Sequence, residues 1–299
     1  MAPKQGVADS PRPLRGRLRD EAQRLQVPID LVERDYALGY VLSACYRRDA
    51  LAAALVFKGG TALKKAYFGD YRFSVDLDFT AVGGPRGDQL EAEIGALAAD
   101  VERGLGEHGP FAVAASRRPE QRGHPTGQEA FRLAVQFPWH RSPLCSIKVE
   151  ITTDEPLLLP AADRPLLHGY EEELSATLRC YSLEEIVAEK LRTMLQAEKR
   201  LEEGKWLRDC ARDYYDLWRL CANSDVAVDF AEVGRILPAK CAVRGVEAHC
   251  VDDFFPELVV EGAGRQWGSS LANLVRPLPE FAVALGEIRA SLIRCLDNW

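Results

Sequence analysis

The stretch from Phe57 to Thr80, FKGGTALKKAYFGDYRFSVDLDFT, constrains the fold of this chain more than any other. The apolar residues 54–57 predict a buried strand, and Gly59–Gly60 ends that strand. A helix is predicted to begin at residue 61 and to end near residue 69, and a second strand follows over residues 74–80. This order of elements predicts an α/β core around two strands.

Two acidic side chains share one face of the second predicted strand. Because side chains alternate along a strand, Ser74, Asp76 and Asp78 point to one face, and the apolar residues between them point to the other. The Cα atoms of the two aspartates are then roughly 6–7 Å apart. A protein tolerates like charges at this separation mainly when a cation lies between them, and oxygen ligands suit Mg²⁺ or Mn²⁺.

The glycine pair predicts a site for phosphate. Bare backbone N–H groups at a helix start bind anions, and the same two metal ions bind nucleotide phosphates. Taken singly, an Asp-x-Asp pair is more often the polar face of an edge strand, and Gly59–Gly60 is an ordinary turn. The order strand, glycine turn, helix and acidic strand favours a nucleotide site instead. The chain has no Gly-x-x-x-x-Gly-Lys-Ser/Thr segment, which argues against a P-loop enzyme.

This stretch resembles the nucleotidyltransferase signature of the DNA polymerase β superfamily, in which a small-residue pair precedes an acidic strand. The pair here is Gly59–Gly60 and the acidic strand has the sequence DLDF at residues 76–79, although the separation between them is slightly longer than usual. More narrowly, KGGTAL at 58–63 with SVDLDF at 74–79 is similar to the AbiEii/AbiGii-type toxins. Those are nucleotidyltransferases of bacterial toxin–antitoxin and phage-defence systems.

Two later motifs extend the resemblance to about residue 220: Glu189–Lys190, and RDYYDL at residues 212–217. The resemblance implies catalytic roles for Asp76, Asp78, Lys190 and Asp213. It implies that the NTP is bound by Lys58, Gly59, Gly60, Thr61, Ser74 and Lys190, and the metal by Asp76, Asp78 and Glu150. Asp213 would orient Lys190 or act as an acid near the acceptor, and Ser74 would contact phosphate or itself be modified.

Glu150 lies on another predicted strand, Cys145–Thr152, which alternates cleanly between apolar and polar residues. If this strand lies beside the acidic strand, Glu150 is the natural third carboxylate, and the family has an acid at this point. The alternative is a surface glutamate paired with Lys148. The pattern leaves both interpretations open.

The composition is that of a soluble globular protein, with 47% hydrophobic and 28% charged residues in 299. No apolar run is long enough to cross a membrane, and residues 1–10 lack the apolar core of a signal peptide. The eight cysteines include no Cys-x-x-Cys pair, so we expect reduced thiols and a cytoplasmic location. The net charge of −7 counts weakly against a dedicated nucleic-acid binder, although the local field matters more.

We expect three regions: a basic N-terminal arm over 1–27, a nucleotidyltransferase core over 28–155, and a mainly helical C-terminal domain over 156–299. Residues 154–170 are rich in proline and leucine and predict an irregular crossing between the two halves. Ser182 and Glu185 predict a capping box at a helix start. Residues 261–270 predict an irregular piece before a last helix over 279–296.

The expected reaction is Mg²⁺-dependent transfer of a nucleotide from an NTP to an acceptor. The resemblance implies that the acceptor is RNA, namely the 3′ end of tRNA, and that the protein is a growth-inhibiting toxin with a cognate antitoxin. Basic residues between Lys190 and Arg212 predict a surface for RNA. The alternatives are transfer to a small molecule or to a protein hydroxyl, and a non-catalytic nucleotide-binding regulator. The intact Asp76-Leu77-Asp78 argues against the regulator.

Overall fold

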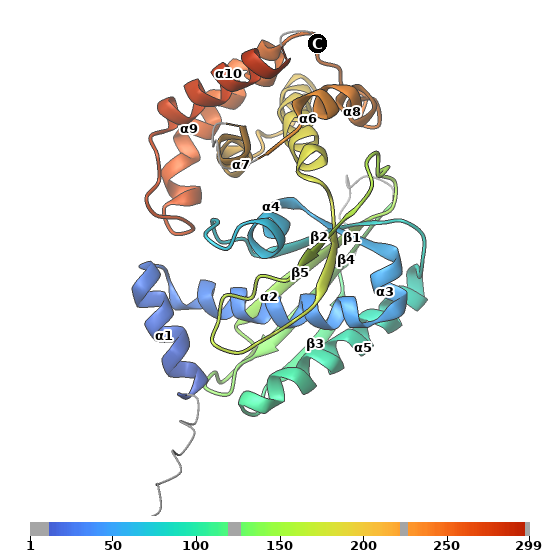
Figure 1. Ribbon diagram of the computed structural model, residues 1–299, viewed down its shortest axis with the longest axis vertical. Coiled ribbons are helices and arrows are strands. Elements are labelled where there is room, and N and C mark those ends of the chain that lie inside the picture. Colours follow the sequence, from blue (N-terminus) through green and yellow to red (C-terminus); the bar gives the residue numbers. More distant parts are fainter. Residues whose placement is uncertain (1–11, 119–126, 222–226, 297–299) are drawn as a thin grey trace, which may run out of the picture.

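A computed structural model of the chain describes residues 12–118, 127–221 and 227–296. A sheet with helices packed on it forms one half, and a group of helices forms the other (Figure 1). The chain passes from the first half to the second at the start of α6 (Leu183–Glu202). No helix in the described ranges is long and apolar enough to cross a membrane.

The sheet has seven strands in the order β3-β4-β5-β2-β1-β7-β6. It is mixed: β2 runs antiparallel to β1 and parallel to β5, and β7 runs parallel to β1. The acidic strand β2 is therefore inside the sheet, with a neighbour on each side. The strands are β1 Leu55–Lys58, β2 Asp76–Ala81, β3 Ala112–Arg117, β4 Gln128–Gln136, β5 Cys145–Thr152, β6 Ala162–Pro165 and β7 Thr177–Cys180.

The helices fall into two groups that pack on opposite faces of β1. In the first half they are α1 Leu14–Leu25, α2 Ile29–Arg47, α3 Asp49–Ala54, α4 Gly59–Ala62 with a π-turn at Leu63–Tyr67, and α5 Gly87–Leu105. In the second half they are α6, α7 Ala211–Cys221, α8 Phe230–Ala242, α9 Glu257–Leu271 and α10 Phe281–Leu296. Phe57 packs in the core with α2 and α5, whereas Val56 packs in the core formed by α6 to α10. Because neighbouring residues of β1 point to opposite cores, this strand joins the two halves.

The structure confirms an α/β core with a mixed sheet and C-terminal helices, and it corrects several local predictions. Strand β2 begins at Asp76, so Ser74 precedes it. Residues 154–170 contain β6, and β7 follows, so the sheet continues beyond residue 155 into the part predicted to be helical. These strands are only four residues long, too short to produce a periodic pattern.

Two further predictions about the C-terminal half are wrong. Residues 261–270 lie within the helix α9, because Val259, Ala263 and Trp267 form an apolar stripe whose packing outweighs the helix-breaking tendency of the glycines. Ser182 caps α6 as predicted, but the Glu185 side chain does not return to it. The Glu185 carboxylate instead accepts hydrogen bonds from the backbone N–H groups of residues 158 and 159, at 2.9 and 3.2 Å.

Candidate active site

Three carboxylates lie on one face of the sheet where β2 runs between β1 and β5. The strand register places Asp78 opposite Lys58 of β1 and opposite Glu150 of β5, with Asp76 two residues away on the same face of β2. The Glu150 carboxylate also lies 2.7 Å from the Lys148 ammonium and accepts a hydrogen bond of 2.7 Å from the Gln128 amide. Glu150 therefore lies beside the acidic strand and is also paired with Lys148, and its role as a metal ligand stays a prediction.

The electrostatics of Asp78 are unusual for an aspartate. Burial raises its pKa to about 6, and the negative charges of Glu150 and Asp76 add to the rise. The positive charges of Lys58 and Lys190 lower the Asp78 pKa but do not cancel this rise. An ionised carboxylate here is under strain that a cation would relieve, because a positive charge favours the ionised form.

The oxygen-only donors Asp76, Asp78 and Glu150 fit a hard divalent cation by their chemistry. Within the described residues, however, no group of three His, Cys, Asp or Glu side chains is already close enough to hold a metal. Mg²⁺ is usually bound by one or two carboxylates together with water and substrate phosphates, rather than by a cage of protein ligands alone. An open, incomplete acidic site is consistent with that mode of binding.

The glycine pair is explained by close approach of charged groups. Gly59 has φ +78°, and a Cβ atom there would lie 2.7 Å from the Asp78 carboxylate. A Cβ atom on Gly60 would lie 2.4 Å from the guanidinium of Arg72. The Thr61 hydroxyl donates a hydrogen bond of 2.5 Å to the Asp76 carbonyl, so a phosphate contact by Thr61 would use its N–H group.

Lys190 of α6 is held by two carboxylates of α7. Its ammonium lies 2.6 Å from Asp213 and 2.7 Å from Asp216. Burial disfavours the charged ammonium, but these two carboxylates outweigh burial and raise the Lys190 pKa. Burial likewise opposes ionisation of Asp213, yet Lys190 and Arg208 lower its pKa to about 2. Of the two roles predicted for Asp213, this geometry suits the orientation of Lys190.

Asp216 connects α7 to the segment before β2. It is fully buried and forms a two-pronged ion pair with Arg72, with both N···O distances at 2.7 Å. The Tyr71 hydroxyl donates a further hydrogen bond of 3.0 Å. Sequence reasoning missed Arg72 and Tyr71, although an arginine in an apolar run just before the acidic strand was a usable signal.

A second ionic cluster joins α6 to β1 and α8. The Lys58 ammonium lies 3.2 Å from Glu189, next to Lys190 on α6. Lys240 of α8 has no exposed surface, and its ammonium lies 2.8 Å from Glu185 and 3.5 Å from Glu189. Burial opposes the ionised form of Glu189, but Lys58 and Lys240 lower its pKa to about 2. Lys240, which the sequence analysis did not identify, therefore helps to hold Lys58 beside Asp78.

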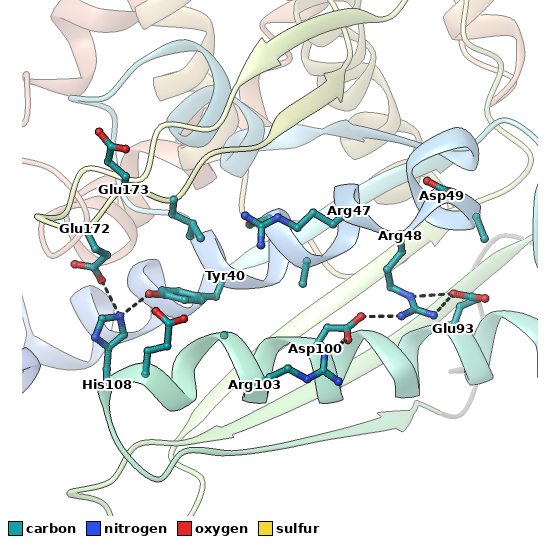
Figure 2. Close-up of a pocket in the computed structure, with 16 residues that line it drawn as sticks. Tyr40, Arg47, Arg48, Asp49, Glu93, Asp100, Arg103, His108, Glu172 and Glu173 are labelled. Atoms are coloured by element: carbon teal, nitrogen blue, oxygen red, sulfur yellow. Dashed lines mark hydrogen bonds and ion pairs between the residues drawn. The ribbon is translucent and has the colours of Figure 1, made fainter.

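A separate cavity of about 820 Å³ lies between α2 and α5 and contains none of the predicted site residues. Arg48 spans it to Glu93 and Asp100, and Tyr40 is hydrogen-bonded to His108 at 2.7 Å (Figure 2). The acidic site on β2 is therefore not this cavity. It lies on the opposite face of the sheet, where α6 and α7 pack.

Comparison with known families identifies the family of the chain. The model of the family described as "Nucleotidyl transferase AbiEii toxin, Type IV TA system" matches residues 40–287. A comparison with curated proteins gives no match. The matched range contains β1, the glycine pair, β2, Glu150, Lys190 and Asp213. The chain belongs to the AbiEii family of nucleotidyltransferase toxins of toxin–antitoxin systems.

Proposed function

We propose that this protein transfers a nucleotide from an NTP to the 3′ end of tRNA, in a reaction that depends on Mg²⁺ or Mn²⁺. The transfer would block translation and growth, in toxin–antitoxin and phage-defence settings, and a cognate antitoxin protein would restrain it. The observation that carries the proposal is the Asp78 carboxylate with its pKa raised to about 6, set beside two other acids and opposite buried lysines. Such a site is suited to a divalent cation and a triphosphate together.

The acidic side chains and the backbone N–H groups of the site would have different roles. Asp76, Asp78 and Glu150 would hold the metal, which supplies neutralisation of the triphosphate and a lowered pKa for the acceptor hydroxyl. The backbone of Gly59–Gly60, with the Thr61 N–H, would bind the β- and γ-phosphates. The acceptor hydroxyl would then release its proton to solvent and attack the α-phosphorus in line. The bond from the α-phosphorus to the oxygen that bridges it to the β-phosphorus would break, and pyrophosphate would leave with that oxygen.

Lys190 would supply positive charge from the helical half. Three cations (Arg72, Lys190 and Arg208) surround the two carboxylates of Asp213 and Asp216, so the cluster keeps an excess of positive charge. Lys190 is also near enough to Asp78 to act on its pKa. A compact ammonium in this position suits a triphosphate oxygen. The site therefore requires both halves of the chain.

The predicted RNA surface between Lys190 and Arg212 needs one correction. Lys190 and Arg192 are inside the protein, and the Arg192 guanidinium is ion-paired with Glu155 at 2.5 Å. The cations that remain near the surface are Lys199, Arg200, Lys205, Arg208 and Arg212. A smaller basic surface is left, on the end of α6, the loop after it and the start of α7.

The test is incubation of the protein with each α-labelled NTP, Mg²⁺ and total RNA. Label should appear in RNA of tRNA size, and Asp76→Ala and Asp78→Ala should abolish it while the fold persists. Asp88→Ala, on the exposed surface of α5, is the matched control. Label on protein or on a small molecule would support the alternative acceptors, and no label with any NTP at saturating Mg²⁺ would refute nucleotidyl transfer.

A further inference from the structure

The loop between α6 and α7 carries a tryptophan in solvent. Trp206 is 71% exposed, the most of any large apolar side chain in the described residues. The guanidinium carbon of Arg200 lies 5.3 Å from the centre of its ring. Because Arg200 covers one face, the exposed area belongs to the other face and the edges. A supported, open aromatic face is a surface on which a flat group can stack.

The residues around Trp206 are charged rather than apolar. Lys205 precedes it and Arg208 follows two residues later, while Glu203 is ion-paired with Lys205 at 2.5 Å. Arg200 and Arg212 form no ion pair with any residue in the described ranges. A docking face for a protein would have an apolar centre, whereas here Leu207 packs against the core of the helical half and Trp206 is the exposed large apolar side chain of residues 203–210. Cations beside an aromatic face are instead typical of surfaces that bind single-stranded nucleic acid.

The loop borders the candidate active site. The Arg208 guanidinium lies 3.2 Å from the carboxylate of Asp213, the residue that holds Lys190. Two residues of extended chain span at most about 7 Å, so the Cα atom of Trp206 lies within that distance of the Cα atom of Arg208. The predicted triphosphate site at Gly59–Gly60 belongs to the first half of the chain, at the start of α4, whereas Trp206 belongs to the helical half. The Asp78 carboxylate acts electrostatically on Arg208, two residues after Trp206, so this loop lies near the acids of β2.

We propose that Trp206 stacks on a base of the acceptor RNA near its reacting end, with Arg200 supporting the ring from behind and Lys205 and Arg212 binding neighbouring phosphates. The inference rests on the proposed transfer to RNA and names the residue that positions the acceptor. Trp206 would select single-stranded RNA ends, because a base must be unpaired and unstacked to reach the ring.

The first test measures binding of a short single-stranded oligoribonucleotide without NTP. Trp206→Ala should weaken binding by roughly 5- to 150-fold, the range for loss of one base–aromatic stack. Trp206→Phe should retain most of the affinity. Val283→Ala, which removes an exposed apolar side chain on α10, should change nothing. Equal thermal stability of the variants will show that the loop remains folded.

The second test removes the base instead of the ring. Oligoribonucleotides with one abasic residue near the 3′ end should bind the wild type more weakly at one position. The Trp206→Ala variant should bind this abasic oligoribonucleotide as tightly as it binds the intact one, because the two changes remove the same contact. In transfer assays, Trp206→Ala should raise the KM for RNA and leave the KM for NTP and the rate at saturating RNA unchanged.

Three results would overturn the inference: no loss of affinity in Trp206→Ala, additive losses at every abasic position, or a raised KM for NTP alone. A loss of antitoxin binding without any loss of RNA binding would also overturn it, in favour of a protein contact. The proposed function fails separately, if the wild type labels no RNA. The binding and abasic measurements need no transfer, so they still decide whether Trp206 stacks on a base.

Discussion

Replacing Asp78 with asparagine should stabilise the metal-free protein at neutral pH. The pKa of this carboxyl is raised from an ordinary 3.8 to about 6, mainly by burial and then by Glu150 and Asp76. The folded state thus holds the proton more tightly than the unfolded state. Asp78→Asn keeps the shape of the side chain and removes its charge, so the variant lacks the repulsion that the wild type carries.

The size of the effect follows from proton linkage. One pKa unit corresponds to about 1.36 kcal/mol, so a rise from 3.8 to about 6 corresponds to at most about 3 kcal/mol. Below pH 3.8 the carboxyl is protonated in both states and costs nothing. As pH rises from 3.8 to 6, only the unfolded state loses the proton, and the wild type loses stability. Above pH 6 the full cost is present.

The measurement is thermal unfolding at pH 4, 5, 6 and 7.5 with a metal chelator. The variant should match the wild type at pH 4 and gain stability up to pH 7.5, where the difference in Tm should be at most about 5 °C. Adding Mg²⁺ at pH 7.5 should raise the Tm of the wild type and reduce the difference, because the metal binds the folded wild type. Asp88→Asn, at an exposed site on α5, should show no pH-dependent gain.

Two outcomes would refute this reasoning. One is an Asp78→Asn variant no more stable than the wild type at pH 7.5 without metal, which would mean that burial and the neighbouring acids do not penalise the charge. The other is a gain that is the same at pH 4 and pH 7.5. In either case, burial and repulsion at Asp76, Asp78 and Glu150 would not favour a bound cation.

Three other predictions address the framework of the site. Gly59→Ala should cost about 1–3 kcal/mol of stability and most of the transfer activity, because φ is +78° and the new Cβ would lie 2.7 Å from the Asp78 carboxylate. Gly69→Ala, which has open space around it, should be nearly neutral. Urea denaturation measures both stabilities. Asp216→Ala should destabilise the fold by about 3–5 kcal/mol, because it leaves Arg72 buried without its partner. Asp213→Ala should cost less stability but abolish transfer. Equal losses of stability for the two variants in denaturant titrations would contradict this assignment. A fragment of residues 1–160 should not fold, as measured by circular dichroism, because it lacks β7, which pairs with β1, and Glu189, which pairs with Lys58. A fragment that folds cooperatively and transfers nucleotide would disprove a site shared by the two halves.

Local periodicity was enough to predict the acidic part of the site. Asp76 and Asp78 share a face because side chains alternate along any strand, and the same rule placed Glu150 on the polar face of its own strand. The glycine pair before a helix was equally visible, since glycine allows a positive φ. These features depend on neighbouring residues in the chain, so they could be predicted without knowledge of the remaining fold.

Only the tertiary structure decided which residues from distant parts of the chain meet at these acids. Packing of α6 against α7 brings Lys190 to Asp213 and Asp216, and packing of α7 against the segment before β2 brings Arg72 to Asp216. The pairing of β7 with β1 was likewise invisible, because a four-residue strand has no period to detect. Helical periodicity shows which residues share a face, but not which partner that face will meet, since the partner is selected by burial of the whole apolar surface. For this reason Lys240 and Arg72, buried charges whose partners lie far away in the sequence, became part of the site only once the two halves were packed together.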